Sequence, residues 1–372
     1  MTDPAPKQRP KVFVVNSNET HRRELGSVLA RLFDVSGYGN NSLALDALRE
    51  TAPDIVLIDD RMLEGCRGVL YDKRKEEELC KIPFIVTGKS GEAILTADGS
   101  KNYGELDLYV PRPFSKNKII TDISNLLSRS VEKSWEKLEP LQKSALQKSV
   151  EEFKALSMAI EERQPLDLES SFESCKPLVE SINNQNIHEI LENVKEHHNY
   201  TYVHSLRVAT YLSLFGYAIG IRGHELLTLS TGGLLHDVGK MVTPQDMLNK
   251  NGKLSAKEFT IIKSHVDHTS EILDRTPGVT EGIRIIAEQH HEKLNGKGYP
   301  KGLKGSQLND LARMSAIVDI FGALTDARSY KPAFPAEKAF AILEDMSDGL
   351  DQSLIKVFRK SLEEQGYGTA IN

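Results

Sequence analysis

The stretch Leu234-Leu-His-Asp-Val-Gly-Lys240 places two metal-capable side chains, His236 and Asp237, at the end of an apolar run. A second pair, His290-His291, begins the stretch HHEKLNGKGYP, which ends at Pro300. Packing alone does not explain such pairs, because polar and charged groups are costly to bury without a partner. We therefore expect the functional site to lie in this half of the chain.

The composition indicates an ordinary soluble globular protein with room for two domains and a connector. The chain has 372 residues, of which 39% are hydrophobic and 27% are charged. Its formal net charge of −6 argues against a general nucleic-acid binder, including a DNA binder, because such proteins are usually basic. A compact anionic ligand could still bind at a local cluster of cations.

The sequence predicts a cytoplasmic protein with no membrane insertion. Its first residues, MTDPAPKQRPK, lack the apolar core of a signal peptide, and no run approaches the roughly 18 apolar residues of a spanning helix. Cys66, Cys80 and Cys175 are far apart and form no CxxC motif. We interpret them as incidental thiols of a reducing compartment.

After a tail of residues 1–10, residues 11–128 alternate between short apolar runs and helical patterns. Helices are expected at about residues 21–33 and 116–129. Strands separated by helices predict an α/β doubly wound parallel sheet covered on both faces. Strands are expected at four apolar runs, which are Val12–Val15, Ile55–Ile58, Phe84–Val86 and Leu108–Val110.

The carboxyl ends of these strands carry Asn16, Ser17, Asp59, Thr87 and Arg112. The run PDIVLIDD and the strand order resemble the receiver domain of two-component response regulators, with Asp59 as the candidate phosphoacceptor. Asn16 and Ser17 replace the family's acidic pair, which removes most of the charge that would hold Mg²⁺, and Arg112 replaces its lysine. We favour a degenerate receiver kept for dimerisation or docking of another protein; phosphorylation of Asp59 by an upstream kinase is the alternative.

Residues 129–164 carry apolar side chains mostly three or four positions apart among many Lys, Glu and Gln. This pattern is typical of an amphipathic helix or a short coiled coil, and Pro140 is expected to break or kink it. We interpret the segment as a connector between two domains. Its apolar stripe packs either on its own chain or on a second copy, so a homodimer through this connector or through the receiver-like domain stays open.

Residues 165–372 predict an all-α helical bundle, because their signals are almost wholly helical. Imidazole and carboxylate groups together suit Mn, Fe, Zn, Co or Ni. Seven such groups exceed what one ion can use, whereas two ions sharing a carboxylate would use them all. Such a pair suits phosphoester hydrolysis. The candidate ligands are His204, His236, Asp237, His265, His290, His291 and Asp319. The other histidines are interpreted as surface or core residues.

From about residue 185 to 350 the chain resembles the HD-GYP family, a branch of the HD metal-dependent phosphohydrolases that hydrolyses cyclic di-GMP. The resemblance rests on HDVGK, on HHEKLNGKGYP, and on RMSAIVDIFGALTDARSYK from Arg313 to Lys331. It implies one metal held by His204, His236, Asp237 and Asp319, with Asp237 bridging to a second. The second site would be completed by His265, His290 and His291.

The resemblance also implies roles around the metals. Lys240 would act near the scissile phosphate, Tyr299 would face the ligand, and Arg328 and Lys331 would grip its phosphate or guanine. Some members bind a third metal through a glutamate where this chain has Tyr200, so we predict two metals. Fe or Mn is expected first, with Zn, Co or Ni left open.

Two departures bear on the activity. Asn295 replaces an aspartate of the GYP motif, and Gly322 replaces an aspartate that follows the ligand Asp319 by three residues. Losing a carboxylate next to a metal ligand typically costs 10- to 100-fold in affinity or activity. We predict a phosphodiesterase, slow if these losses count, that converts cyclic di-GMP to pGpG and further to GMP. The alternatives are a catalytically weak or inactive cyclic di-GMP receptor that keeps its metals, and a phosphohydrolase of another nucleotide.

Overall fold

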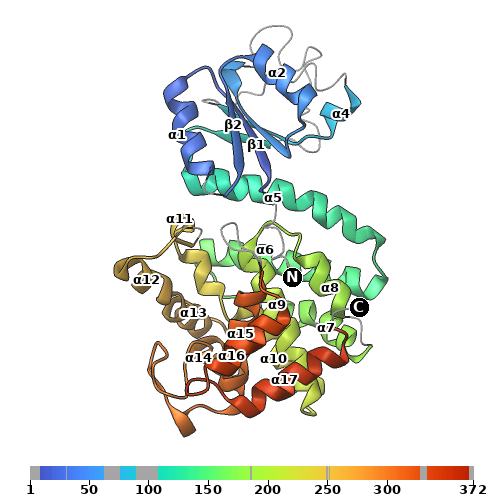
Figure 1. The fold of residues 1–372 in the computed structure, drawn as a ribbon, viewed down its shortest axis with the longest axis vertical. Coiled ribbons are helices and arrows are strands. Elements are labelled where there is room, and N and C mark those ends of the chain that lie inside the picture. The colour runs from blue at the N-terminus through green and yellow to red at the C-terminus, as the bar shows by residue number, and fades with distance from the viewer. Residues whose placement is uncertain are drawn as a thin grey trace. The chain divides into compact units, whose positions relative to one another are not determined.

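The chain folds into two compact units, an N-terminal unit of Lys7–Ser130 and a C-terminal unit that comprises Val131–Leu248 and Gly252–Asn372 (Figure 1). Each unit is described by itself. The computed structural model describes residues 9–30, 32–62, 76–88, 108–184, 187–248, 250, 252–326 and 333–367.

The N-terminal unit is built on a five-stranded parallel sheet in the order β2-β1-β3-β4-β5. This order gives the receiver-like fold expected from the sequence, and the doubly wound sheet is confirmed. Its strands are β1 (Lys11–Val15), β2 (Asp34–Tyr38), β3 (Ile55–Asp59), β4 (Phe84–Gly88) and β5 (Leu108–Pro111).

Alternate residues of the central strands enter two separate apolar clusters, one on each face of the sheet. Val12 and Val14 pack with side chains from α1 (Glu19–Leu29) and α5 (Lys116–Ser134). Phe13 and Val15 pack with α2 (Asn41–Glu50) and the short α4 (Glu77–Cys80). A strand buried on both faces reads as a continuous apolar run, which explains why these strands were recognisable in the sequence.

The edge strand β2 and the limits of α1 were not predicted. β2 has the sequence DVSGY and is half-exposed, so it lacks the apolar run by which the other strands were found. The helix expected at residues 21–33 spans Glu19–Leu29 instead. Asn18 caps its N-terminus by accepting a hydrogen bond from the His21 backbone N–H, so the cap sets the start of the helix.

The segment expected to be a connector is divided between several elements. α5 ends at Ser134, a single 3₁₀ turn follows at Trp135–Lys137, and α6 (Pro140–Glu161) begins at the proline. The missing N–H of Pro140 costs nothing in the first turn of a helix, so the residue starts α6 and does not kink it. The apolar stripe of α6 packs with α7 and α9, and so belongs to the C-terminal unit.

The C-terminal unit is all-α, as predicted; its described residues contain no strand, only an isolated bridge between Asn295 and Lys304. After α6 its longer helices are α7 (Leu168–Asn183), α8 (Ile187–Val194), α9 (Tyr200–Ala218), α10 (Gly223–Leu235), α12 (Ala256–Lys263), α13 (His265–Asp274), α14 (Glu281–Gln289), α15 (Asp310–Thr325), α16 (Ala336–Asp345) and α17 (Gln352–Glu364). Two short helices, η3 (Val238–Val242) and α11 (Gln245–Leu248), follow α10.

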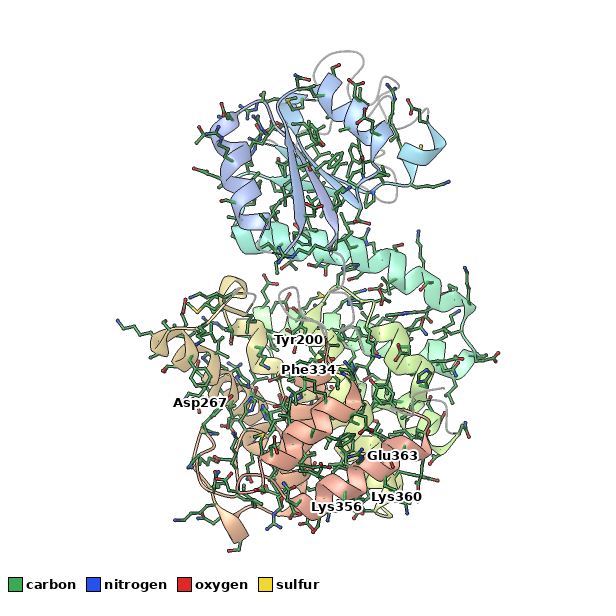
Figure 2. All side chains as sticks on the ribbon, viewed as in Figure 1. Tyr200, Asp267, Phe334, Lys356, Lys360 and Glu363 are labelled. Atoms are coloured by element: carbon green, nitrogen blue, oxygen red, sulfur yellow. The ribbon has the colours of Figure 1, made fainter. Side chains whose placement is uncertain are left out.

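Helix α9 forms the centre of this unit. Its side chains from Tyr202 to Phe215 are buried, as expected of a helix that is surrounded by others. α17 covers it with an apolar face, while Lys356, Lys360 and Glu363 lie on the exposed side of α17 (Figure 2). No helix among the described residues combines the length and apolar character that a membrane crossing requires.

Candidate metal centre

All seven predicted ligands lie in the C-terminal unit, and six of the seven come from the ends of helices or the core-facing side of α15. His236 caps the C-terminus of α10 and Asp237 follows it. His265 begins α13, and His290 caps the C-terminus of α14. His204 differs from these residues because it lies inside α9.

The first group of side chains is formed by His204, His236, Asp237 and Asp319, whose ligand atoms all lie within 4.8 Å of one another. The Nε2 atom of His204 is 2.9 Å from Oδ1 of Asp319 and 3.7 Å from Oδ2 of Asp237. The Nε2 atom of His236 is 3.3 Å from the same Asp237 oxygen. All four side chains are buried.

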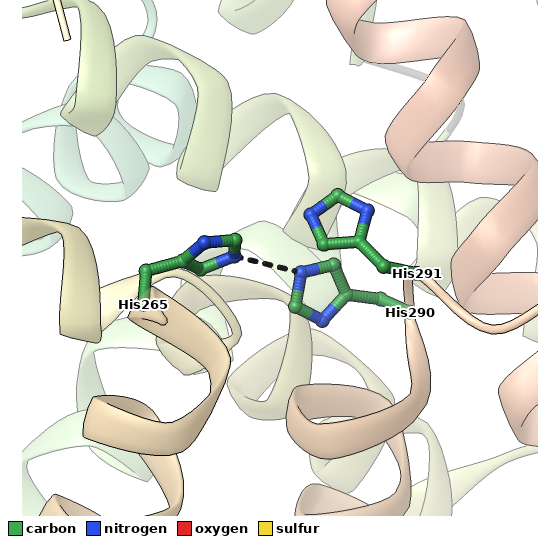
Figure 3. Close-up of side chains that lie close together, drawn as sticks. All are labelled: His265, His290 and His291. Carbon is green, nitrogen blue, oxygen red and sulfur yellow. Dashed lines mark hydrogen bonds between the residues drawn. The ribbon is translucent and has the colours of Figure 1, made fainter. Parts of the chain in front are cut away.

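The second group is formed by His265, His290 and His291 (Figure 3). The Nε2 atoms of His265 and His290 are 3.4 Å apart. Asp237 adjoins both groups, because its other oxygen, Oδ1, lies 3.2 Å from Nε2 of His265 and 3.8 Å from Nε2 of His290. Each oxygen of one carboxylate thus faces a different group, which is the arrangement that a bridging ligand needs.

Three histidines are oriented by the last turn of the helix that precedes each of them. Nδ1 of His236 lies 2.7 Å from the carbonyl oxygen of Gly233, and His265 and His290 make the same contact with the carbonyl three residues earlier. Carbonyls in a last helical turn have no partner within the helix. Each ring therefore donates from Nδ1, which leaves the lone pair of Nε2 for a metal.

Burial and the two carboxylates set the charges in the cluster. Burial alone would lower the pKa of His236, but the Asp237 and Asp319 carboxylates outweigh it and raise the pKa to about 9. Burial lowers the pKa of His291 to about 3 and holds that of His290 well below its ordinary value. The pKa of Asp237 stays well below its ordinary value because His236 and Lys240 outweigh the effect of burial.

The site retains buried polar atoms that have no hydrogen-bond partner in the protein. Nε2 of His236 and Oδ1 of Asp237 are buried and have no hydrogen-bond partner among the described residues. Buried polar atoms are rarely left so, and each such case calls for an explanation such as an ion. Nitrogen and oxygen donors in this mixture suit divalent transition metals. The cluster therefore fits a site for divalent transition metals.

The sequence HDVGK needs its glycine for close packing. A Cβ atom at Gly239 would lie 2.0 Å from the carbonyl oxygen of His265 and 2.7 Å from the backbone nitrogen of Thr269. The Gly239 N–H donates to the hydroxyl of Thr269 at 3.0 Å. This contact places η3 against α13 and so brings the HD pair to His265.

The GYP loop lies beside the second group. The Tyr299 ring lies 4.6 Å from the His291 ring, measured between centroids. Glu292, which is buried and was not predicted, accepts backbone hydrogen bonds from Lys301, Gly302 and Leu303 and so holds the loop. A Cβ at Gly298 would lie 2.4 Å from the Cα of Glu292, so the loop requires glycine there.

The remaining predicted residues are placed as follows. Lys240 is hydrogen-bonded through Nζ to Oδ2 of Asp237. Tyr200, at the position compared with a glutamate, stacks on His204 with ring centroids 5.9 Å apart (labelled in Figure 2). Arg328 and Lys331 lie outside the described residues.

The two departures have visible consequences. Asn295 braces its loop, since it accepts from the Lys297 N–H at 3.0 Å and donates to Asp348 at 3.0 Å. Gly322 lies beside the His204 ring, yet that ring has a carboxylate partner in Asp326, which the sequence reading missed. Arg207, a fully buried cation on α9, was a signal for it, because a buried guanidinium needs a counter-charge.

Asp59 lies at the end of β3 in the N-terminal unit and is satisfied by arginine. Its carboxylate accepts hydrogen bonds from Nε of Arg61 at 2.9 Å and from Asn16 at 3.0 Å, and it is ion-paired with Arg112 at 2.9 Å. Burial would raise the pKa of Asp59, but Arg61 and Arg112 outweigh it and lower the pKa. Thr87 is buried next to it on β4, while Ser17 is exposed.

Comparison with known protein families shows that residues 185–354 match the HD domain family. The chain is 36% identical over 165 residues to 3'3'-cGAMP-specific phosphodiesterase 3 of Vibrio cholerae, a match that covers 44% of this chain and 35% of that protein. It is 27% identical over 363 residues to a cyclic di-GMP phosphodiesterase of Thermotoga maritima, covering 95% of this chain and 90% of that protein.

The fold also has a solved counterpart. An HDG"Y"P protein from Bdellovibrio bacteriovorus aligns with a TM-score of 0.50 and 18% identity over 69% of this chain and 90% of its own. At that identity the likeness shows the fold alone. The chain spans about a third of the length of the Vibrio relative and nearly all of the Thermotoga one.

Proposed function

We propose that this protein is a metal-dependent phosphodiesterase that opens cyclic di-GMP to pGpG, with further cleavage to GMP. The observation that carries the proposal is the position of Asp237, whose two oxygens face two adjoining groups of buried histidines. Seven ligands in this arrangement would hold two ions, with Fe or Mn expected first. The activities named for the Vibrio and Thermotoga relatives are of the same kind.

A cleft of about 510 Å³ next to the second group offers a place for the substrate. His291 and Asp319 of the metal centre are among its lining residues. The lining also includes Lys263, Lys293, Lys297, Tyr299 and Phe259. Three lysines in one cleft supply the local positive charge that an anionic dinucleotide needs, although the whole chain is acidic. The aromatic rings offer surfaces on which a purine can stack.

The metals would supply Lewis-acid charge and an activated water when bound. The chain's own residues orient the reaction. Asp237 lies between the two groups of histidines, and Lys240 is held next to it by a hydrogen bond to Oδ2 of Asp237. A lysine in this position stabilises negative charge that develops on the phosphate. The GYP loop, held by Glu292, closes one side of the cleft through Tyr299.

The test is an assay of metal-replete, anaerobically purified protein with cyclic di-GMP and, separately, with 3'3'-cGAMP, since relatives are named for both. We expect chromatography to show pGpG, and GMP at longer times, with cyclic di-GMP cleaved faster. Measurable binding of cyclic di-GMP without any linear product would contradict the phosphodiesterase activity and indicate a receptor. Cleavage of 3'3'-cGAMP alone would overturn the choice of substrate.

Elemental analysis tests the two-metal proposal. We expect close to two ions per chain and a fall towards one in His290→Ala, because His290 belongs to the second group alone. The matched control is His224→Ala, which removes an exposed histidine of the same domain and should keep both ions. One ion in the wild type, or no change in His290→Ala, contradicts the two-metal site.

We also propose that Asp59 is a structural anchor of the N-terminal unit and accepts no phosphoryl group. Both of its oxygens are taken by Arg61, Arg112 and Asn16, so neither is free to attack a phosphoryl donor. Acetyl phosphate with Mg²⁺ should leave the intact mass unchanged. A stable acyl phosphate mapped to Asp59 would reject the proposal and support a kinase-regulated receiver. The unit would then act through docking or dimerisation, and size-exclusion chromatography with light scattering distinguishes a monomer from a homodimer.

A further inference from the structure

His204 differs from the other metal-facing histidines in how its ring is held. His236, His265 and His290 each use a backbone carbonyl in the last turn of a helix. His204 is the fifth residue of α9, where each carbonyl already accepts a hydrogen bond within the helix. No backbone acceptor of that kind is available to its Nδ1, so a side chain must take the role.

Asp326 is that side chain. Its Oδ2 atom lies 3.0 Å from Nδ1 of His204, and it is 2% exposed. Its other oxygen accepts a hydrogen bond from Nη1 of Arg207, and Arg207 also donates to the carbonyl and hydroxyl oxygens of Thr325. Arg207 lies one turn beyond His204 on α9, and Asp326 ends α15. One buried ion pair therefore joins the two helices that carry His204 and Asp319.

The neighbouring Gly322 shows why this partner is needed. A Cβ atom at Gly322 would lie 3.3 Å from Cε1 and 3.5 Å from Nδ1 of His204. A carboxylate at position 322 could thus reach the same ring nitrogen, but glycine offers none. Asp326, which is one helical turn further along, approaches this nitrogen from the end of α15 instead.

We propose that Asp326, held by Arg207, is the positioning residue that fixes the orientation of the His204 ring and keeps its Nε2 free for a metal. It replaces the carboxylate that Gly322 lacks. A carboxylate behind a ligating imidazole sets the tautomer and raises the basicity of the ligand, and its loss typically costs 10- to 100-fold in metal affinity. The proposal rests on the metal site proposed above, and nucleotide cleavage is not needed to test it.

The first test is the metal affinity of Asp326→Asn, measured by competition with a chelator using Zn²⁺. Asparagine keeps an acceptor for Arg207, so the fold should survive, which circular dichroism checks. We expect one of the two ions to lose about 10- to 100-fold in affinity. The matched control is Asp351→Asn, which removes the charge from another arginine-paired aspartate of the same domain, Arg313 being its partner at 3.2 Å. Equal affinities of Asp326→Asn and wild type would overturn the proposal.

A rescue and a measurement on the wild type keep the test independent of one variant. Asp326→Ala should lose affinity, and adding Gly322→Asp should restore part of it, because position 322 reaches the same ring nitrogen. In Zn²⁺-loaded wild-type protein with ¹⁵N-labelled histidine, we expect His204 to carry a slowly exchanging proton on Nδ1. Zinc on Nδ1, or a freely exchanging proton there, would reject the role of Asp326 even if every variant failed to fold.

The outcomes separate this inference from the proposed function. Hydrolysis by the wild type together with an unchanged metal affinity in Asp326→Asn would reject the role of Asp326 and support the phosphodiesterase activity. A weakened site in Asp326→Asn with no hydrolysis by the wild type would do the reverse. Absence of any metal binding by the wild type would sink both.

Discussion

Asp59 and Asp237 are both carboxylates that are 1% exposed, and the two units satisfy them in opposite ways. Arg61, Arg112 and Asn16 surround Asp59 in the N-terminal unit. Asp237 faces imidazoles and one lysine, and its Oδ1 has no hydrogen-bond partner among the described residues. The difference indicates that a buried carboxylate whose oxygens are paired with arginines stabilises the fold, whereas a buried carboxylate with an unpaired oxygen can bind a ligand.

The replacements that distinguish the two sites are chemically small. In the N-terminal unit, the resemblance to receiver domains implies a carboxylate where neutral Asn16 stands and a lysine where the forked cation of Arg112 stands. Arginine is suited to such a closed pair because its planar guanidinium contacts both oxygens. Here Arg112 contacts Asp59 and also Asp60, at 2.8 Å. Four histidines, His204, His236, His265 and His290, lie within 3.8 Å of the Asp237 carboxylate, and none of the six other candidate ligands is an arginine.

The largest effect is expected from Asp237→Asn. Both groups of histidines lose their shared carboxylate, so bound metal should fall from two ions to one or none. Hydrolysis should drop by about 10²- to 10³-fold, the loss typical of removing one group that stabilises transition-state charge. Elemental analysis and product chromatography measure both. The matched variant Asp59→Asn should keep its metals; loss of metal there would break the comparison.

A second effect is expected on stability when Arg112 is replaced by Met. Asp59 keeps Arg61 but loses a partner that is itself mostly buried, with 16% of its side chain exposed. Leaving a buried charge short of a partner costs about 1–3 kcal/mol. The free energy of unfolding in urea should fall by that amount, while metal content stays at the wild-type level. An unchanged unfolding curve would show that the arginine clamp is not structural.

Acidity should affect the two sites in opposite directions. The pKa of His236 is raised to about 9 by Asp237 and Asp319 against the effect of burial, so the ring is protonated in the metal-free protein at pH 7. A metal must displace that proton, and its affinity should rise about tenfold per pH unit up to pH 9. The raised pKa also stabilises the metal-free fold below about pH 6.5, and this contribution is lost as the pH rises towards 9.

The contribution of Asp59 to stability changes with pH in the opposite direction. Its pKa is lowered by Arg61 and Arg112 despite burial. Its contribution to the stability of the fold is therefore present above the unfolded pKa near 3.8 and is lost as the pH falls through the lower folded pKa.

Calorimetric titration of Zn²⁺ in two buffers of different ionisation enthalpy measures the proton released at His236. Thermal unfolding of the metal-free protein from pH 3 to 9 measures the contributions of His236 and Asp59 to stability. Metal binding that releases no proton at pH 7 would contradict the charge assigned to His236.

The smallest effect is expected from Asn295→Asp, which restores the residue of the GYP motif. Asn295 braces a loop turn and contacts Asp348, and no predicted ligand is among its hydrogen-bond partners. Aspartate would keep the acceptor for the Lys297 N–H but face Asp348 with like charge, so stability should change by about 0.5 kcal/mol or less. Metal content and turnover should stay within about twofold of the wild type. A large gain in turnover would show that Asn295 limits the activity.

Much of the fold could be predicted because its signals are local. The buried strands were visible as apolar runs, and the all-α half was visible from its spacing. The edge strand β2 was missed, since a half-exposed strand with glycine and serine has no such run. The limits of α1 depended on one capping residue, Asn18. The role of Pro140 was decided by the end of α5 at Ser134, which periodicity alone does not reveal.

The sequence by itself determined the kinds of chemistry present: seven metal-capable side chains in order, a glycine-rich loop and a receiver-like sheet without its acidic pair. It did so because residue identity and spacing are written along the chain. Only the tertiary structure decided which groups meet: that Asp237 lies between two sets of imidazoles, that arginines enclose Asp59, and that Asp326 stands behind His204 from 122 residues away. Such pairings depend on how helices pack, and distance along the chain carries no information about them.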